Sequence, residues 1–144
     1  MIRHAGLVAT RLGGRWRGAL IEGPSGTGKS DLAIRMMVNG FRLVADDRTV
    51  VWTSGRRLYG KAPEALSGLL EARGVGIIPQ PPLEFCEIVL LVECRREPGA
   101  VERMPDSTPT DVMGVPLPRI ELWPFEAAGP AKLRRALEHL GGGA

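Results

Sequence analysis

The chain has 144 residues, 44% of them hydrophobic and 24% charged, and a formal net charge of +3. This length predicts one domain with a sizeable core. The basic residues are scattered and aromatic residues make up only 5%, which argues against a nucleic-acid-binding surface. The sequence contains no secretory signal and no apolar run of ~20 residues, so we expect a soluble, cytoplasmic protein without a membrane span.

In chain order, the first elements predicted are a strand hairpin and a helix. Leu7–Thr10 and Trp16–Ile21 are apolar runs separated by the turn-forming pair Gly13-Gly14. The segment Ser30–Asn39 has apolar residues at helical spacing, and Gly40 is placed to end that helix.

Between the second strand and the helix lies a complete phosphate-binding motif of the form G-x-x-x-x-G-K-[ST]. It reads Gly23-Pro24-Ser25-Gly26-Thr27-Gly28-Lys29-Ser30. The glycines allow successive N–H groups to point at one anion, and a Cβ at Gly28 would crowd the phosphate. Lys29 supplies charge for the β- and γ-phosphates, and the Ser30 hydroxyl can ligate Mg²⁺. Strand, loop and helix follow in the order that places a phosphate at a helix N-terminus.

The rest of the chain contains more strands than a simple alternation of strands and helices would give, and predicts an α/β domain. Expected strands are Phe41–Ala45, Thr49–Trp52, Arg57–Tyr59, Gly74–Ile78, Cys86–Cys94 and Pro118–Leu122. Pro63–Leu70 is expected as a short helix or helical turn, Arg95–Pro109 as a polar loop, and Pro130–Leu140 as a terminal amphipathic helix with Leu133, Ala136, Leu137 and Leu140 inward.

The two cysteines, Cys86 and Cys94, lie eight residues apart on the longest apolar run. Their even spacing predicts that both face the same side of a strand, ~26 Å apart at ~3.3 Å per residue, which is too far for a disulfide. No CxxC pattern is present, so we expect two buried, reduced core residues.

Asp46 and Asp47 directly follow a predicted apolar strand, where side chains reach toward the ligand crevice of an α/β sheet. Adjacent strand residues point to opposite faces, so one aspartate can face the phosphate while the other orients a neighbour or a metal-bound water. Phosphoryl transfer needs such a carboxylate to orient the attacking hydroxyl. The alternative is an acidic turn that caps the strand.

Three further candidates are weaker when taken alone. Glu71 and Arg73 could supply a metal ligand and a transition-state cation, but a surface turn with a salt bridge has the same composition. His4 is compatible with a solvated terminal histidine. Arg103 is compatible with an arginine finger or a surface charge.

Four segments occur in an order that resembles the catalytic domain of HPr kinase/phosphorylase, the bacterial enzyme acting on a serine of the phosphocarrier protein HPr. They are His4-Ala5, Gly23–Ser30, Arg42–Asp47 and Leu70–Ile78, the last similar to the family signature L-E-[IV]-R-G-[LIV]-G-I-[IV]. The likeness covers nearly the whole chain and is greatest with the short alphaproteobacterial form.

The resemblance implies an α/β P-loop kinase domain of the phosphoenolpyruvate carboxykinase-like type, a mixed sheet with flanking helices. It implies that residues 1–144 form a single catalytic domain without the N-terminal regulatory domain. It further implies ATP and Mg²⁺ as cofactors, an HPr-like phosphocarrier as substrate, and a homo-hexamer, with no nucleic-acid or membrane partner.

The resemblance also assigns roles to residues. Gly23–Ser30 would bind ATP, and Ser30 with Glu71 would hold Mg²⁺. Asp47, beside Asp46, would accept the proton of the substrate serine and return it during phosphorolysis. Lys29, Arg73 and Arg103 would neutralise charge on the phosphates. His4 would lie beside the site.

The sequence departs from the family pattern at two places, of which the first should not disturb the charges and the second bears on phosphorolysis. Ala72 stands where a β-branched residue is usual, and Pro79–Pro82 replaces an Asn-Val-containing loop that in the family touches HPr and serves phosphorolysis. The kinase interpretation survives these changes better.

The leading hypothesis is therefore a serine kinase acting on HPr in a phosphotransferase system. A small-molecule P-loop kinase and an ATP-binding sensor without phosphotransfer remain as alternatives. Intact Asp46, Asp47 and Glu71 argue against the sensor, because a pure binder needs no base beside the γ-phosphate.

Overall fold

The computed structural model describes residues 1–106 and 108–141. The predicted first elements are confirmed. Strands β2 (Ala5–Leu12) and β3 (Arg15–Glu22) pair antiparallel around the glycine turn, and α1 (Lys29–Val38) follows. Gly40 has φ 89°, a left-handed conformation that glycine adopts readily, and it ends the helical path as expected.

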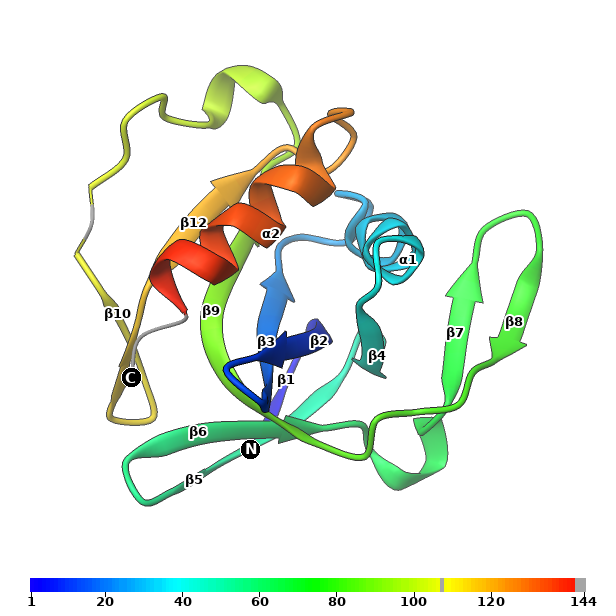
Figure 1. Ribbon diagram of the computed structural model, residues 1–144. Helices are drawn as coiled ribbons and strands as arrows, with labels where there is room; N and C mark the ends of the chain where they lie inside the picture. The colour runs from blue at the N-terminus through cyan, green and yellow to red at the C-terminus, as the bar shows by residue number, and fades with distance from the viewer. Residues whose placement is uncertain (107, 142–144) are drawn as a thin grey trace.

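Within the described residues the main sheet has eight strands and mixed pairing (Figure 1). Its order is β1-β5-β6-β9-β3-β2-β4, with β12 also on β9; the parallel pairs are β3 with β9 and β9 with β12. The strands not yet given are β1 (Ile2–Arg3), β4 (Arg42–Ala45), β5 (Thr49–Ser54), β6 (Arg57–Lys61), β9 (Cys86–Cys94) and β12 (Arg119–Leu122). The mixed sheet and its flanking helices agree with the fold class predicted from the sequence.

Two hydrophobic cores lie on the two faces of the sheet. On one face, α1 and α2 (Gly129–Leu140) pack against the strands through Leu32, Met36 and Leu133, which are fully buried. On the other face the sheet curls, so that β5 and β6 close over the apolar side of β2, β3 and β4 (Figure 1). Leu58 and Leu7 belong to this second core.

The cysteine prediction is half right. Cys86 and Cys94 are both buried and free, but they lie in different cores, on opposite faces of β9. The pairing of β3 with β9 shifts between Gly18 and Ala19, which are partnered by Ile88 and Leu90. One extra residue in β9 therefore inverts the alternation of side chains beyond that point.

The middle of the chain differs from prediction in one place. Instead of a helix reaching Leu70, a three-residue 3₁₀ turn, η1 (Glu64–Leu66), is followed by strand β7 (Leu69–Ala72). β7 pairs antiparallel with β8 (Gly76–Pro79) as a separate two-stranded hairpin. Alternation explains this, because Leu70 and Ala72 are buried while Leu69 and Glu71 are exposed. In Figure 1 the hairpin projects to the right of the sheet.

The segment after β9 begins with η2 (Pro98–Ala100), runs as the predicted polar loop, and then forms an unpredicted hairpin of β10 (Thr110–Val112) and β11 (Val115–Leu117). The terminal helix is confirmed, with Leu133 and Leu137 buried. Leu140 is 41% exposed, so its predicted inward position is wrong. Among the described residues, neither helix has the length and apolar character needed to cross a membrane.

Candidate active site

The phosphate-binding motif, Gly23–Ser30 (the phosphate loop), lies between the carboxyl end of β3 and the start of α1. Gly28 is the residue before the helix and has φ 98°, while its carbonyl accepts the first helical hydrogen bond from Leu32 at 2.9 Å. No side chain caps this helix end. The first backbone N–H groups of α1 therefore remain available to an anion, and the helix dipole favours negative charge there.

Internal hydrogen bonds fix the shape of the loop. The carbonyl of Pro24 accepts from the Thr27 amide at 3.3 Å, the Thr27 hydroxyl at 2.7 Å and Lys29 Nζ at 3.2 Å. Lys29 Nζ also donates to the Gly23 carbonyl at 2.7 Å. Thr27 is 1% exposed, so its side chain supports the loop from within. The lysine ammonium thus lies over the loop whose amides would hold the phosphates.

Asp46 connects the phosphate loop to two other elements. It follows the last residue of β4, and its Oδ1 accepts a hydrogen bond from Ser30 Oγ at 2.9 Å. Its Oδ2 accepts one from the backbone N–H of Glu71 in β7 at 3.0 Å. The predicted aspartate and the predicted glutamate are therefore adjacent, joined through the backbone of the glutamate.

Asp47 has a different environment from Asp46. It is exposed, and its backbone has φ 67°, a left-handed conformation that aspartate tolerates better than most residues. The Arg48 amide donates to the Asp46 carbonyl at 2.7 Å and closes this tight turn. Among the described residues, no hydrogen bond or ion pair involves the Asp47 carboxylate.

The other predicted site residues lie at the rim. His4 is exposed between β1 and β2; Ala5 pairs with Glu22, so His4 comes level with the start of the phosphate loop. Arg73 is exposed in the turn of the β7–β8 hairpin, and Arg103 is exposed in the segment between η2 and β10. That segment runs away from α1 in Figure 1. The structure therefore brings Ser30, Asp46 and the backbone of Glu71 together, with Arg73 two residues further along the hairpin, and leaves Arg103 in a segment away from α1.

The donor set suits a hard cation. Ser30 Oγ and Asp46 Oδ1 are oxygen ligands 2.9 Å apart beside the loop, and Mg²⁺ in phosphoryl-transfer sites takes one or two protein oxygens plus phosphate oxygens and water. No cluster of three or more acidic, histidine or cysteine side chains occurs in the described part of the chain. A cation here would therefore depend on the nucleotide for its remaining ligands.

The sequence did not indicate the ion pair behind the phosphate loop. Glu22, the last residue of β3, accepts from Arg3 Nε at 2.7 Å and from Arg3 Nη2 at 2.8 Å. This hydrogen-bonded pairing raises the pKa of Arg3 above its ordinary value. The two-point contact ties the chain beside His4 to the strand that enters the loop. Only the three-dimensional pairing of β1 and β2 with distant strands reveals it.

The sequence also did not place the connection between β12 and α2 at the site. Phe125 lies against Gly28: the Cβ that Gly28 lacks would be 2.8 Å from the ring Cζ. A side chain at Gly28 would therefore meet Phe125, in addition to any phosphate.

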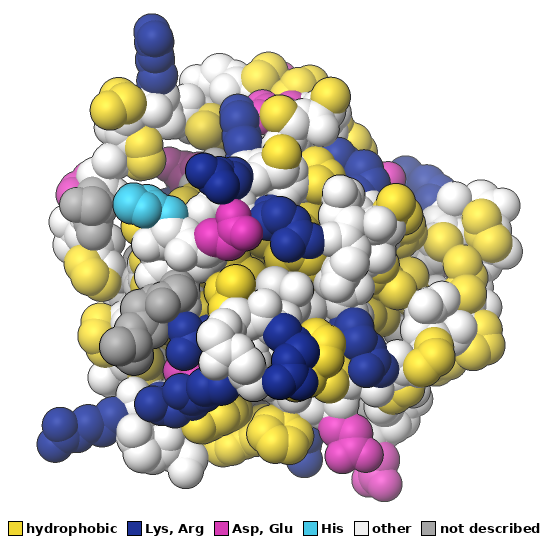
Figure 2. All heavy atoms as spheres, viewed as in Figure 1, with side chains coloured by type: hydrophobic (Ala, Val, Ile, Leu, Met, Phe, Trp, Pro, Cys, Tyr) yellow, Lys and Arg dark blue, Asp and Glu magenta, His cyan; other side chains and the backbone are white. Residues whose placement is uncertain are grey.

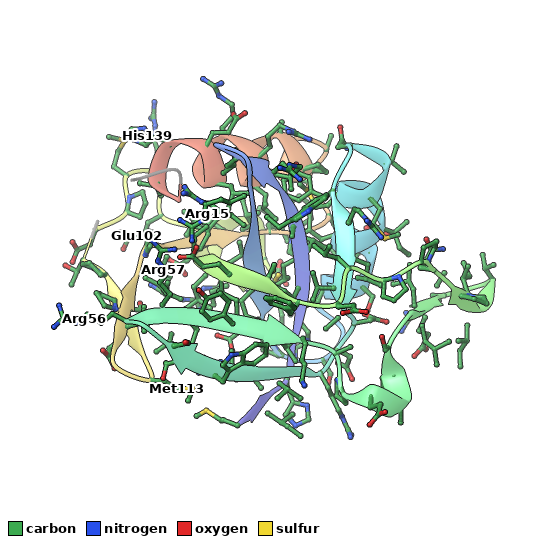
Figure 3. All side chains as sticks on the ribbon, turned by 60° about the horizontal axis from the view of Figure 1, so that its bottom comes forward. Arg15, Arg56, Arg57, Glu102, Met113 and His139 are labelled. Carbon is green, nitrogen blue, oxygen red and sulfur yellow. The ribbon has the colours of Figure 1, made fainter. Side chains whose placement is uncertain are left out.

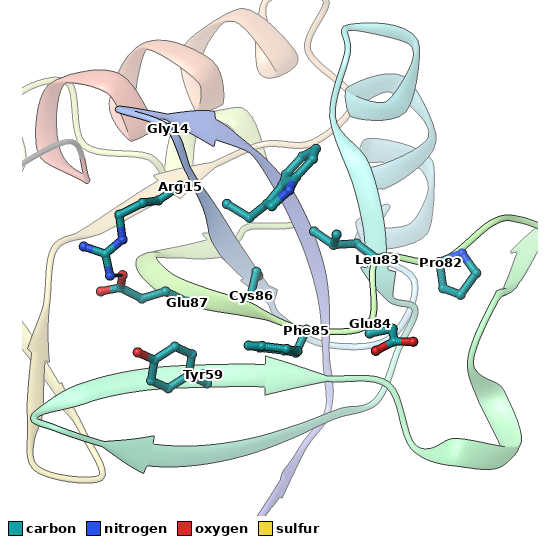
Figure 4. A pocket seen from close by; sticks show the side chains of 10 residues that line it. Gly14, Arg15, Tyr59, Pro82, Leu83, Glu84, Phe85, Cys86 and Glu87 are labelled. Carbon is teal, nitrogen blue, oxygen red and sulfur yellow. Dashed lines mark hydrogen bonds and ion pairs between the residues drawn. The ribbon is translucent and has the colours of Figure 1, made fainter.

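A separate hollow of about 540 Å³ lies at the other end of β3 (Figure 4). Its lining includes Trp16, Tyr59, Phe85 and the buried Cys86. Arg15 and Arg57, labelled in Figure 3, both pair with Glu87 at its edge, at 3.1 and 4.0 Å. Because the strand separates it from the phosphate loop by about 25 Å at ~3.3 Å per residue, this hollow is no part of the phosphate site.

Strand, phosphate loop and helix, with a carboxylate from the neighbouring β4 bonded to the loop serine, define a P-loop α/β domain. Residues 13–81 match the family model described as the HPr Serine kinase C-terminal domain. Nearly half of the chain is thus similar to this domain.

Individual HPr kinase/phosphorylases are also similar to this chain in sequence. The HPr kinase/phosphorylase of Clostridium tetani is 34% identical over 115 residues, covering 73% of this chain and 38% of that protein. That of Brevibacillus brevis is 53% identical over 62 residues, covering 42% of this chain and 20% of that protein. The chain thus spans well under half the length of these relatives.

A solved structure shows the same fold. The structure of the Hpr(Ser) kinase/phosphatase from Coxiella burnetii superposes with a TM-score of 0.78, covering 96% of this chain and 89% of that chain at 22% identity.

Proposed function

We propose that this chain is an ATP-dependent protein serine kinase that phosphorylates an HPr-like phosphocarrier protein. The observation that carries the proposal is the pair of aspartates after β4. Asp46 is hydrogen-bonded to Ser30 of the phosphate loop, and Asp47 next to it has a free, exposed carboxylate. The family match and the names of the relatives supply the acceptor.

In the proposed mechanism, the phosphate loop and the N-terminus of α1 bind the triphosphate of ATP. Lys29 lies over the loop and offsets charge on the β- and γ-phosphates. Ser30 and Asp46 would hold Mg²⁺, together with Glu71, whose backbone N–H donates to the Asp46 carboxylate. The ion would neutralise the charge that develops on the phosphate oxygens. Arg73 and Arg103 would add positive charge when the acceptor protein brings these segments together, and His4 would lie beside the site.

Asp47 would accept the proton of the substrate serine. The serine oxygen forms a bond to the γ-phosphorus, the bond from that phosphorus to the bridging oxygen breaks, and ADP leaves with the bonding electrons. The serine proton goes to the Asp47 carboxylate. In phosphorolysis, an orthophosphate oxygen would form a bond to the phosphorus of phosphoserine while the bond to the serine oxygen breaks, which gives pyrophosphate, and Asp47 would return a proton to the serine oxygen.

The direct test is phosphate transfer. Purified chain, Mg²⁺-ATP and an HPr-like protein should give phosphoserine on the acceptor, detected by mass spectrometry. Lys29→Ala should weaken ATP binding and transfer together. Tight ATP binding without transfer would favour the sensor, and transfer to small hydroxyl compounds alone would favour a small-molecule kinase.

Two finer points belong to the same proposal. Transfer should require Mg²⁺ and should stop with a chelator. A hexameric assembly, which the family resemblance suggests, would appear as six times the 15.5 kDa chain mass in light scattering.

A further inference from the structure

The segment 123–128, which joins β12 to α2, lies at the same edge of the sheet as the phosphate loop. β12 is parallel to β9, and β9 is parallel to β3, so the loops after β12 and β3 leave the sheet at neighbouring carboxyl ends. Ligands of α/β sheets bind in the crevice outside these ends. Segment 123–128 therefore borders whatever the phosphate loop binds.

An aromatic shelf forms where this segment meets the loop. The Phe125 ring packs directly on Gly28, with 2.8 Å between its Cζ and the position of a Cβ there. Trp123 meets the Phe125 ring edge-on, with centroids 6.5 Å apart and planes at 71°. Phe125 is nevertheless 54% exposed. The ring thus contacts the loop and still offers apolar surface beside the helix end that would hold phosphates.

Arg35 fixes the shelf to the helix that carries the loop. Its guanidinium donates to the carbonyls of Pro124 and Glu126, the latter at 3.2 Å, on either side of Phe125. Its Nε is held in turn by Asp31, at 3.0 Å. Because Arg35 and Asp31 both belong to α1, the shelf and the phosphate loop are connected as one unit.

We propose that Phe125 is the platform on which the base of the bound nucleotide stacks, with Arg35 as the residue that positions it. The inference rests on the proposed nucleotide-binding function and names the base subsite of that same site. Base–aromatic stacking needs a fixed ring with an open face, and it tolerates any base because every base has a π-face. Phe125 meets both conditions, and its place beside the loop is within reach of a base whose phosphates the loop holds.

The test compares two ligands that share phosphates but differ in the base. Dissociation constants of Mg²⁺-ATP and of inorganic tripolyphosphate are measured by calorimetry. Phe125→Ala should weaken ATP about tenfold, which equals ~1.4 kcal/mol, and leave tripolyphosphate within about twofold. Phe125→Trp should restore ATP affinity. Arg35→Ala should lower the ratio of ATP to tripolyphosphate affinity in the same direction by a smaller factor.

Phe85→Ala is the matched control, because Phe85 is 53% exposed and lies at the distant hollow. It should change neither affinity. Equal weakening of ATP and tripolyphosphate by Phe125→Ala would mean that the ring only supports the loop, and would overturn the platform. Unchanged ATP binding in that variant would overturn it too, while leaving the kinase proposal intact. If the unaltered chain binds neither ligand, the nucleotide site itself fails and the platform with it.

Discussion

The phosphate loop and the β7–β8 hairpin both contact Asp46, but they are held in different ways. In the loop, one carbonyl accepts three hydrogen bonds and Thr27 is buried. In the hairpin, Val75 is 75% and Ile77 is 68% exposed, and Leu70 is the residue that joins the core beneath α1. Figure 2 shows exposed hydrophobic side chains on the projecting part where Figure 1 places this hairpin.

Because of this difference, the loop and the hairpin suit different ligands within the proposed site. A phosphate is small and always the same, so a loop with a fixed shape suits it and avoids the cost of reorganisation during the reaction. A protein acceptor is large and must bring its own serine to the phosphate. An exposed hairpin with apolar side chains suits contact with such a partner. Asp46 connects the two halves, and Asp47, the next residue, is exposed to solvent.

The largest expected effect comes from the free carboxylate between the two regions. Asp47→Asn keeps the shape but removes the base, so transfer to an HPr-like acceptor should fall by about 10²- to 10⁴-fold. ATP affinity should stay within roughly threefold, because the loop is unchanged. Single-turnover transfer and calorimetry measure the two quantities. Asp111→Asn, in the distant β10–β11 hairpin, is the control, and a loss of ATP binding in Asp47→Asn would assign Asp47 to the loop instead.

The second test measures how firmly the hairpin is held. Leu70→Ala removes a side chain that is 3% exposed and packs in the helix-face core, so the free energy of unfolding should fall by about 3 kcal/mol. Ile77→Ala, on the paired strand, should change it by less than about 0.5 kcal/mol. Urea unfolding measures both. Similar losses in the two variants would show that the hairpin is packed as tightly as the loop, which would remove the contrast.

The sequence predicted the parts of the fold that local patterns determine. The glycine turn, the phosphate loop, α1, β9 and α2 all follow from spacing of apolar residues and from glycines at their ends. The β7 strand was missed because Leu69–Ala72 has too few residues to distinguish alternation from a helical turn. The cysteine faces were missed because a bulge in β9, opposite Gly18 and Ala19, depends on the partner strand.

The residues of the candidate site likewise fall into those that local patterns predict and those that they do not. The phosphate loop and the aspartates were predictable, because the motif has fixed spacing and a strand end carries the acids. Arg35 and Phe125 were assigned no role in the site, although Pro124–Ala127 is part of the family resemblance, since an arginine on an amphipathic helix and a single phenylalanine have many ordinary roles. Their importance arises from a contact between residues about 90 positions apart, which no local pattern reports.

The third test compares two glycines with similar backbones. Gly28 has φ 98° and Gly74, in the hairpin turn, has φ 87°, so alanine is strained at both by ~1–2 kcal/mol. Only at Gly28 would the added Cβ meet a neighbour, Phe125, at 2.8 Å; at Gly74 it meets open space. Gly28→Ala should therefore destabilise the protein more than Gly74→Ala and should weaken ATP binding. Equal thermal shifts and equal ATP affinity in the two variants would contradict the contact.

The smallest expected effect concerns the buried cysteine that packs against the phosphate loop. Cys94 lies against Gly23, and burial raises the pKa of its thiol from about 9 to about 12. The native state thus keeps a proton that the unfolded chain releases, so this contribution to stability is complete below pH 9 and is lost as the pH rises toward 12. Between pH 8 and 10 the loss from this one thiol should be ~1 kcal/mol.

Cys94→Ala removes the titrating group, and Cys86→Ala makes the same change to the buried thiol of the other core. Each variant should lower the free energy of unfolding at pH 8. Each should also reduce the fall of that free energy between pH 8 and pH 10 by about 1 kcal/mol. ATP bound to the phosphate loop should oppose the alkaline loss. Because ligand binding stabilises the native state at every pH, the informative quantity is the slope with pH. An unchanged slope in Cys94→Ala would mean that the thiol behind the loop already reaches solvent, and that the loop is held less firmly than its hydrogen bonds indicate.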